Sequence, residues 1–221
     1  MKILGVLGSP RKNGNSEILL NEAFKGAKDA GAETELLRVS DWNIKPCDGC
    51  RTCSEKLKCH QDDDMQILYD KLRAADAIIF ATPVYFWTIP GYFKTFIDRT
   101  FALVYPNAQL ANKVGGVIVV AGRTGETQTS SLFYLFFQVH HMFSADYVHG
   151  FGLLKGEVKQ DVHAMKSSWE LGRQVSLMVK QGYRFPEEYD RAIHALVRKK
   201  YGVPISPAMQ TPEKPELPAS S

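Results

Sequence analysis

The chain has 221 residues and a mass of 24.8 kDa, with 44% hydrophobic and 23% charged residues. These are ordinary values for a folded globular protein, and they exclude a disordered chain, a collagen and a coiled coil. The formal net charge is only +3 and the basic residues form no cluster, so we expect a small-molecule partner and no nucleic acid.

Strand-like apolar runs alternate with amphipathic helical patterns along most of the chain. In chain order we predict a strand at Lys2–Leu7, a helix from about Ser16 to Ala30, a strand at Thr34–Val39, a helix from Asp62–Asp64 through Ala75, a strand at Ala77–Ala81, a helix from about Tyr92 to Phe101, a strand at Gly115–Ala121, an aromatic helix to about Met142, a strand at Tyr147–Leu154 and a helix at Val162–Gln181. This alternation predicts βαβ units, and hence an α/β domain with a parallel sheet.

The end of the chain differs from the rest. A helix is predicted at Glu187–Lys200, and the segment from Val203 to Ser221 carries five of the eleven prolines, so it is expected to lack fixed structure.

Membrane and export signals are not expected. The amino-terminal residues lack the long apolar region and cleavage site of a signal peptide, and Pro, Gly or His interrupts each apolar stretch before it reaches about 18 residues. We therefore expect a cytoplasmic protein that does not associate with membranes.

The loop after the first predicted strand, Gly8–Ser16, carries groups that bind phosphate. Ser9 and Ser16 offer hydroxyls, Arg11 offers a charged fork, and the start of the following helix presents free N–H groups. The segment matches neither the G-x-G-x-x-G dinucleotide motif nor the G-K-[ST] ending of a P-loop, which argues against an NTPase or a Rossmann NAD domain. The alternative is a polar surface turn in which Ser16 only caps the helix.

Two further loops follow strands at the same predicted edge of the sheet, where ligands bind in open parallel sheets. Residues 82–87 (TPVYFW) place apolar and aromatic groups beside the predicted phosphate site, and residues 122–126 (GRTGE) form a turn that can close over a flat ring. Core or subunit-interface packing is the alternative for any single aromatic residue. Three such loops at one edge favour a flat heterocycle that bears a phosphate.

The cysteines form the strongest motif of the chain. Their spacing is Cys-x2-Cys-x2-Cys-x5-Cys, at Cys47, Cys50, Cys53 and Cys59. Such a local cluster favours a metal site over a disulfide framework. Because bacterial ferredoxins use the same initial spacing, the motif predicts a [4Fe–4S] cluster.

Three alternatives remain open for these cysteines. One is a structural zinc site with four cysteines, or with three cysteines and His60, although zinc sites more often pair two CxxC motifs across a longer gap. Another is a set of free thiols. A redox-active dithiol is disfavoured, because such CxxC motifs usually lie at the start of a helix that follows a strand.

The segments GSPRKNGNS and TPVYFWTIPGYFKTFIDR, together with the third loop, resemble the flavodoxin-like NAD(P)H-dependent FMN reductase superfamily. The CDGCRTC…C insertion is similar to that of its iron–sulfur flavoprotein branch. The resemblance spans roughly residues 1–154. It implies a doubly wound five-stranded parallel sheet in the order 2-1-3-4-5, FMN at the strand ends, and a homodimer or homotetramer. We expect a flavodoxin-like domain at 1–182 with a cluster-binding loop at 47–59, followed by a C-terminal extension at 183–221 made of a helix and a proline-rich tail.

The resemblance also implies which residues contact the flavin. The phosphate would be held by Ser9, Arg11, Asn15 and Ser16. The isoalloxazine would be lined by Pro83, Val84, Tyr85 and Phe86, with Gly122, Arg123 and Gly125 at its far edge.

The expected function is an FMN- and [4Fe–4S]-dependent oxidoreductase. NAD(P)H or a ferredoxin would donate electrons, and a small acceptor such as oxygen, peroxide, a quinone or a metabolite would receive them. No catalytic side chain is predicted, because a flavin performs the chemistry while the protein sets its position and potential. The alternatives are an NAD(P)H-dependent FMN or quinone reductase whose cysteines bind zinc or nothing, and a non-catalytic flavin electron carrier.

Overall fold

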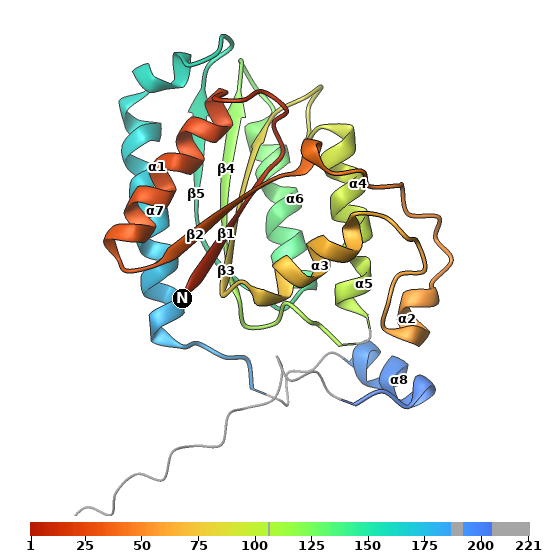
Figure 1. The fold of residues 1–221 in the computed structure, drawn as a ribbon. Coiled ribbons are helices and arrows are strands. Elements are labelled where there is room, and N and C mark those ends of the chain that lie inside the picture. Colours follow the sequence, from red (N-terminus) through yellow and green to blue (C-terminus); the bar gives the residue numbers. More distant parts are fainter. Residues whose placement is uncertain (106, 187–191, 205–221) are drawn as a thin grey trace, which may run out of the picture.

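A single sheet of five parallel strands forms the centre of the protein (Figure 1). The computed structural model describes residues 1–105, 107–186 and 192–204. The strands are β1 (Lys2–Leu7), β2 (Glu33–Arg38), β3 (Ala77–Pro83), β4 (Val114–Ala121) and β5 (Phe143–Phe151). Their spatial order is β2-β1-β3-β4-β5 with parallel pairing throughout, which confirms the doubly wound order that the resemblance implied.

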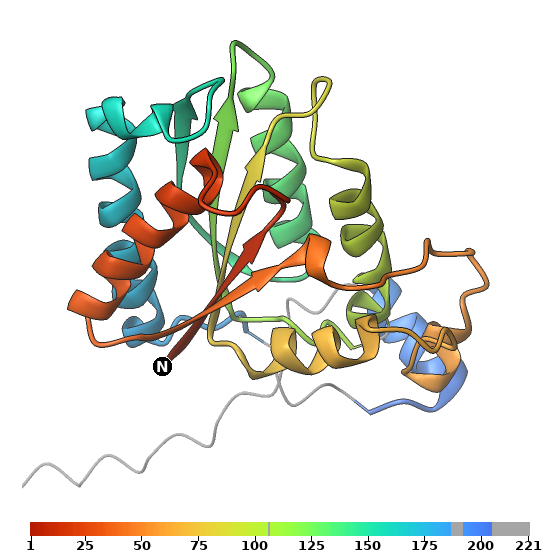
Figure 2. The same ribbon diagram turned by 45° about the horizontal axis from the view of Figure 1, so that its top comes forward.

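Helices cover both faces of the sheet (Figures 1 and 2). One face is covered by α1 (Asn15–Asp29) and α7 (Val162–Gln181). The other face is covered by α3 (Met65–Ala74), α4 (Gly91–Arg99) and α6 (Glu126–Val139). The shorter elements are η1 (Val39–Asp41), α2 (Thr52–Lys56), α5 (Phe101–Val104), η2 (Glu157–Gln160) and α8 (Ala192–Tyr201).

Two apolar cores form because successive side chains of a strand point to opposite faces. Phe80 of β3 packs toward α6, where its ring lies 4.9 Å from that of Phe133, and its neighbour Ile79 belongs to the core under α1 and α7. All eight residues of β4 are buried. Burial on both faces explains why the central strands are almost purely apolar in sequence.

The helices α1 and α7 contact each other through glycines. A Cβ atom at Gly172 of α7 would lie 1.7 Å from the carbonyl oxygen of Ala23, and one at Gly26 of α1 would lie 1.9 Å from that of Trp169. The two backbones are therefore in direct contact, and this contact sets the position of α1 on the sheet.

Some predicted boundaries were wrong. Helix α6 ends at Val139 and not near Met142, and β5 spans Phe143–Phe151 instead of starting at Tyr147. The cause is a left-handed residue, His141 (φ +55°), whose carbonyl accepts a hydrogen bond from the Asn112 N–H at 2.9 Å. This turn directs the chain into the strand after only three residues.

The C-terminal extension is described in part. Of the helix predicted at Glu187–Lys200, residues 187–191 lie outside the described residues, and α8 follows at Ala192–Tyr201. The segment from Val203 to Ser221 is predicted to lack fixed structure, and its residues from 205 onward also lie outside them. Within the described part of the chain, no helix is long and apolar enough to cross a membrane.

A buried histidine follows α6 and makes stability depend on pH. His140 is 2% exposed, and its Nε2 lies 3.3 Å from Thr100 Oγ1. Burial, together with the neighbouring His141 and His194, lowers the pKa of His140 from 6.5 to about 3. The neutral ring is therefore compatible with the fold, whereas the unfolded chain takes up a proton as the pH falls below 6.5.

We expect the stability that His140 contributes to be complete above pH 6.5 and to be lost as the pH falls from 6.5 toward 3. Over this window the free energy of unfolding should fall by up to about 1.4 kcal/mol per pH unit from this group. Urea unfolding of wild type and of His140→Gln at pH 7.5, 6 and 5 measures the effect. The glutamine variant should show the shallower pH dependence, and equal slopes for the two proteins would contradict the assignment.

Candidate functional site

The carboxyl ends of β1, β3, β4 and β5 meet at one edge of the sheet, where its connections diverge (Figure 1). A cleft opens at this edge. Its lining comes from four loops: Ser9, Arg11, Asn15, Ser16, Pro83, Val84, Tyr85, Val120, Gly122, Gly152, Leu153 and Lys155. Eight of the eleven predicted flavin-contacting residues are in this set. Parallel strands bring them together because all their carboxyl ends meet at one edge.

The first loop is shaped for an anion. Ser9 and Ser16 are buried, and the Arg11 N–H donates to Ser9 Oγ at 3.3 Å. Helix α1 begins after Gly14, and no side chain of the described residues caps this end. The N–H groups of its first turn therefore remain for an external acceptor, which is the arrangement that binds phosphate at helix N-termini.

A buried ion pair beneath this loop was missed by the sequence analysis. Arg38, the last residue of β2, donates from Nη2 to Glu17 Oε1 at 2.8 Å, and both side chains are less than 10% exposed. Arg38 Nη1 also donates to the carbonyl oxygens of Ser9 (3.2 Å) and Arg11 (3.4 Å), and Glu17 accepts from the Asn13 N–H. The pair therefore supports the backbone of the first loop.

The side chain of Asn15 makes hydrogen bonds that the sequence did not predict. Its Nδ2 donates to the carbonyl oxygens of Gly152 (3.0 Å) and Leu154 (2.9 Å), and its Oδ1 accepts from the Gly156 N–H at 2.8 Å. The side chain thus ties the first loop to the segment after β5. Both of its polar atoms are engaged by protein, and the residue also lines the cleft.

The segment after β5 adds a fourth wall to the cleft. Glu157 accepts hydrogen bonds from the N–H groups of Leu153 (2.7 Å) and Leu154 (2.8 Å), and these bonds lower the pKa of its carboxyl group. This arrangement places Leu153 and Lys155 along the cleft. Lys155 supplies a second cation beside Arg11, and the sequence analysis did not identify it because no local pattern marks it.

The second loop is strained at its tip. Tyr85 and Thr88 exchange two backbone hydrogen bonds, at 2.7 and 3.2 Å, around Phe86 (φ +42°) and Trp87 (φ +74°). Two bulky residues in the left-handed region cost conformational energy. Pro83, Val84 and Tyr85 line the cleft, whereas Phe86 is 95% exposed and does not line it.

The third loop packs on the second. Gly125 has φ +100°, and a Cβ atom there would lie 2.8 Å from Val84 Cγ1, so both its backbone and its neighbours require glycine. Gly122 lines the cleft, and Arg123 is exposed outside it. Arg123, Gly125 and Phe86 are therefore the three predicted contacts that do not line the cleft.

All four cysteines line a second cavity of about 370 Å³, away from the first cleft. Cys53 lies on the short helix α2, and the chain wraps around the cavity through left-handed residues at Gly49 (φ +73°), Arg51 (φ +61°) and Leu57 (φ +56°). None of the four is in a disulfide. In Figures 1 and 2 this segment projects beside α3 and α4.

The charges at this cavity favour a cation. Burial and the neighbouring thiols of Cys59, Cys50 and Cys47 raise the pKa of Cys53. Thiolates that line one cavity repel one another, and a metal relieves that repulsion by binding them. The residues therefore fit a thiolate-bound metal or cluster.

Two polar side chains extend the donor set at the outer edge of the cavity. Asp48 Oδ2 lies 2.7 Å from His60 Nε2, and hydrogen bonds from Cys50 and His60 lower the pKa of Asp48 to about 2. Ligand atoms of Asp48, Cys50 and His60 lie within 4.8 Å of one another. This grouping keeps zinc as the alternative occupant of the cysteine segment.

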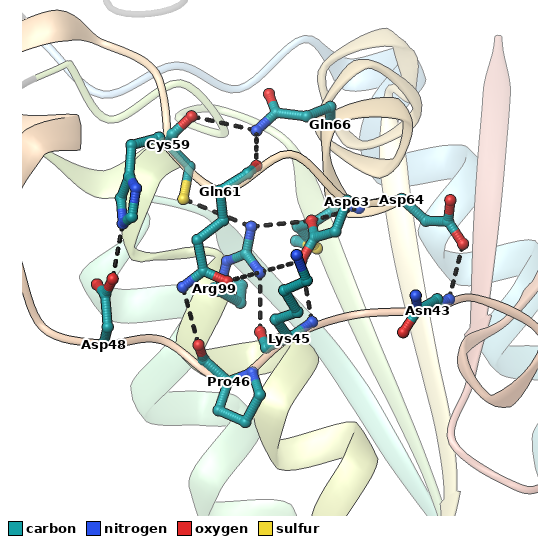
Figure 3. A network of polar contacts seen from close by, with 12 residues as sticks. Asn43, Lys45, Pro46, Asp48, Cys59, Gln61, Asp63, Asp64, Gln66 and Arg99 are labelled. Carbon is teal, nitrogen blue, oxygen red and sulfur yellow. Dashed lines mark hydrogen bonds and ion pairs between the residues drawn. The ribbon is translucent and has the colours of Figure 1, made fainter.

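Arg99 contacts Gln61 and Cys59, two residues that line the cavity, as Figure 3 shows. Its side chain and that of Asp63 are each 1% exposed, and Nη1 donates to Asp63 Oδ2 at 2.5 Å while Nη2 donates to Oδ1 at 3.0 Å. Burial opposes both charges, but the paired hydrogen bonds lower the pKa of Asp63 and raise that of Arg99. Both groups therefore stay ionised.

Comparison with known proteins gives consistent matches. The family model described as NADPH-dependent FMN reductase matches residues 1–149. The iron-sulfur flavoprotein MJ1083 of Methanocaldococcus jannaschii is 36% identical over 190 residues, which cover 81% of this chain and 98% of the relative. The iron-sulfur flavoprotein of Methanosarcina thermophila is 35% identical over 178 residues, which cover 79% and 93%.

A solved structure has the same fold. The crystal structure of RosB with bound 8-demethyl-8-formylriboflavin-5'-phosphate matches with a TM-score of 0.70 and 18% identity, over 100% of this chain and 98% of that chain. This likeness supports the flavodoxin-like architecture found here.

Proposed function

This chain belongs to the NADPH-dependent FMN reductase family of oxidoreductases, in the branch of the iron-sulfur flavoproteins, and we propose that it binds FMN in the first cleft and a [4Fe–4S] cluster at Cys47, Cys50, Cys53 and Cys59. The observation that carries the proposal is the convergence of four loops on one cleft, with a separate cavity that all four cysteines line. Bound FMN supplies one- and two-electron chemistry, and a cluster supplies single electrons.

The phosphate end of the cleft is the end built by the first loop. Ser9, Ser16 and the N-terminus of α1 donate hydrogen bonds there, and Arg11 and Lys155 supply positive charge. Asn15 fixes the position of the loop after β5 through its hydrogen bonds, and so shapes the phosphate end of the cleft indirectly.

The ring end of the cleft is apolar. Pro83, Val84 and Tyr85 line one side, and Gly122 with Leu153 lines the other. Side chains of this kind exclude water from a flat ring and leave backbone groups to bond its polar edge. Arg123, Gly125 and Phe86 belong to the second and third loops without lining the cleft, and they would contact the flavin from these loops.

We propose NAD(P)H or a ferredoxin as the electron donor and a small acceptor such as oxygen, peroxide, a quinone or a metabolite. The family description supports NADPH. A homodimer or homotetramer is proposed on the resemblance given above. The residues named here bind and orient cofactors, and none is proposed to donate or accept a proton during turnover.

The proposal is tested by composition and absorbance. Protein purified without oxygen should contain about one FMN and about four irons per chain, with flavin bands on a broad cluster absorbance. Cys50→Ser should lose most of the iron and keep the FMN, because the two sites are separate. Thr52→Ser, in the same segment, should keep both.

Other outcomes distinguish the alternatives. Zinc in place of iron would make the cysteine segment structural, and FMN without any metal would leave a simple reductase. Full FMN occupancy without NAD(P)H-dependent reduction of an added quinone would favour a non-catalytic carrier. A protein that binds neither flavin nor metal would overturn the proposal.

A further inference from the structure

The side chain of Arg99 joins the two ends of the cysteine segment (Figure 3). Its Nη1 donates to the Lys45 carbonyl oxygen at 2.8 Å, just before Cys47. On the other side it binds Asp63 through both nitrogens and reaches Gln61 Oε1 at 3.2 Å, just after Cys59. One buried guanidinium therefore closes the loop that carries all four thiols.

Asp63 reinforces this closure. Its carboxylate also accepts hydrogen bonds from the backbone N–H groups of Lys45 (2.9 Å) and Met65 (3.1 Å). The backbone of Arg99 is tied to α3, because its carbonyl oxygen accepts a hydrogen bond from the Tyr69 hydroxyl at 2.9 Å. The orientation of the guanidinium is thus set by groups outside the cysteine segment.

One contact of Arg99 reaches a thiol directly. Its Nη2 donates to Cys59 Sγ at 3.4 Å. A hydrogen bond to a ligating sulfur withdraws negative charge from it, and such bonds are among the factors that set cluster potentials. The donor here is a cation that stays charged, so its effect on the sulfur is larger than that of a neutral amide.

We propose that Arg99 is a positioning residue of the cysteine site, which closes the loop through Lys45 and Asp63 and raises the reduction potential of the bound cluster through its hydrogen bond to Cys59. This inference rests on the proposed function, since it requires a cluster at the four cysteines. It adds a residue from α4 that lies 40 positions after the last cysteine.

Three variants separate the hydrogen bond from the charge. Arg99→Gln removes a positive charge, so the reduction potential of the cluster should fall. It also leaves Asp63 buried without its partner, which should lower the stability of the protein. Asp63→Asn removes a negative charge and should raise the potential. The double variant Arg99→Gln/Asp63→Asn has the same net charge as wild type, avoids the unpaired carboxylate, and lacks the donor to Cys59.

The measurement is an anaerobic redox titration followed by cluster absorbance, with iron assayed on the same samples. The double variant should keep its iron and titrate at a lower potential than wild type. Arg73→Gln, which removes an arginine paired with Asp70 at the surface of α3, should leave the potential unchanged.

A double variant with the wild-type potential would overturn the inference and leave the proposed function intact. Loss of iron from the double variant while Asp63→Asn keeps its iron would show that Arg99 is needed for assembly, which supports the positioning role. Wild-type protein that contains no iron would overturn the proposed function, and this inference with it.

Discussion

Replacing Gly172 with alanine should destabilise the protein by about 3 kcal/mol. Alanine is the better helix former by about 1 kcal/mol, so propensity alone predicts the opposite sign. The reason is steric: the added Cβ would lie 1.7 Å from the Ala23 carbonyl oxygen and 2.6 Å from its carbon, both backbone atoms of α1. The helices α1 and α7 would have to separate, and the core beneath them would open.

Urea unfolding of Gly172→Ala measures this effect. Lys166→Ala, at an exposed position of the same helix, is the matched control and should change the free energy of unfolding by less than about 0.5 kcal/mol. Gly26→Ala should also destabilise, because its Cβ would lie 1.9 Å from the Trp169 carbonyl oxygen. The double variant should lose less than the sum of the two, since one separation of the helices relieves both clashes. A Gly172→Ala protein as stable as wild type would show that α1 and α7 are not in backbone contact.

The same substitution should weaken FMN binding. Helix α1 carries Ser16 at its first turn and Asn15 at the junction with the segment after β5, so a displaced helix moves both. The contact of α1 with α7 at Gly26 and Gly172 therefore affects the geometry of the first loop.

Replacing Arg38 with methionine should cost about 3–5 kcal/mol, because the Glu17 carboxylate is left buried without its partner. The substitution also removes the donor to the carbonyl oxygens of Ser9 and Arg11. The phosphate loop should therefore lose its shape, and affinity should fall more for FMN than for riboflavin, which lacks the phosphate.

Two measurements check this prediction, urea unfolding and flavin titration by fluorescence. Lys25→Met breaks an exposed ion pair with Glu22 on α1 and should cost no more than about 1 kcal/mol. Adding Glu17→Gln to Arg38→Met should recover part of the stability, because the buried charge is gone, without recovering the preference for FMN. If Arg38→Met unfolds at the wild-type urea concentration, the pair does not support the loop.

Much of the site was predictable from short segments. The alternation of apolar runs and amphipathic helices identified the parallel sheet. In such a sheet the loops that follow the strands lie at one edge, so three loops could be placed together. The cysteine spacing predicts a thiolate site because the four cysteines lie close together in sequence. Each of these inferences used residues that are neighbours along the chain.

Element ends were less predictable. The end of α6 depends on the left-handed His141 and on its hydrogen bond from Asn112, a partner 29 residues away in sequence. The resemblance implied that Asn15 binds the phosphate, and the structure adds that its amide bonds the segment after β5. An asparagine next to a helix start carries no local signal that distinguishes the two roles.

Local patterns thus predicted the strands, the helices, a phosphate-binding loop and a thiol metal site, because hydrophobic period, turn residues and ligand spacing all act over a few residues. Packing specified the rest: Arg38 under the phosphate loop, Lys155 on the fourth wall, and Arg99 at Cys59. These charged side chains look like surface residues in the sequence. They reach the cleft and the cysteine cavity because the fold brings together segments that lie tens of residues apart. Burial then requires Arg38 to pair with Glu17 and Arg99 to pair with Asp63, whereas Lys155 stays exposed.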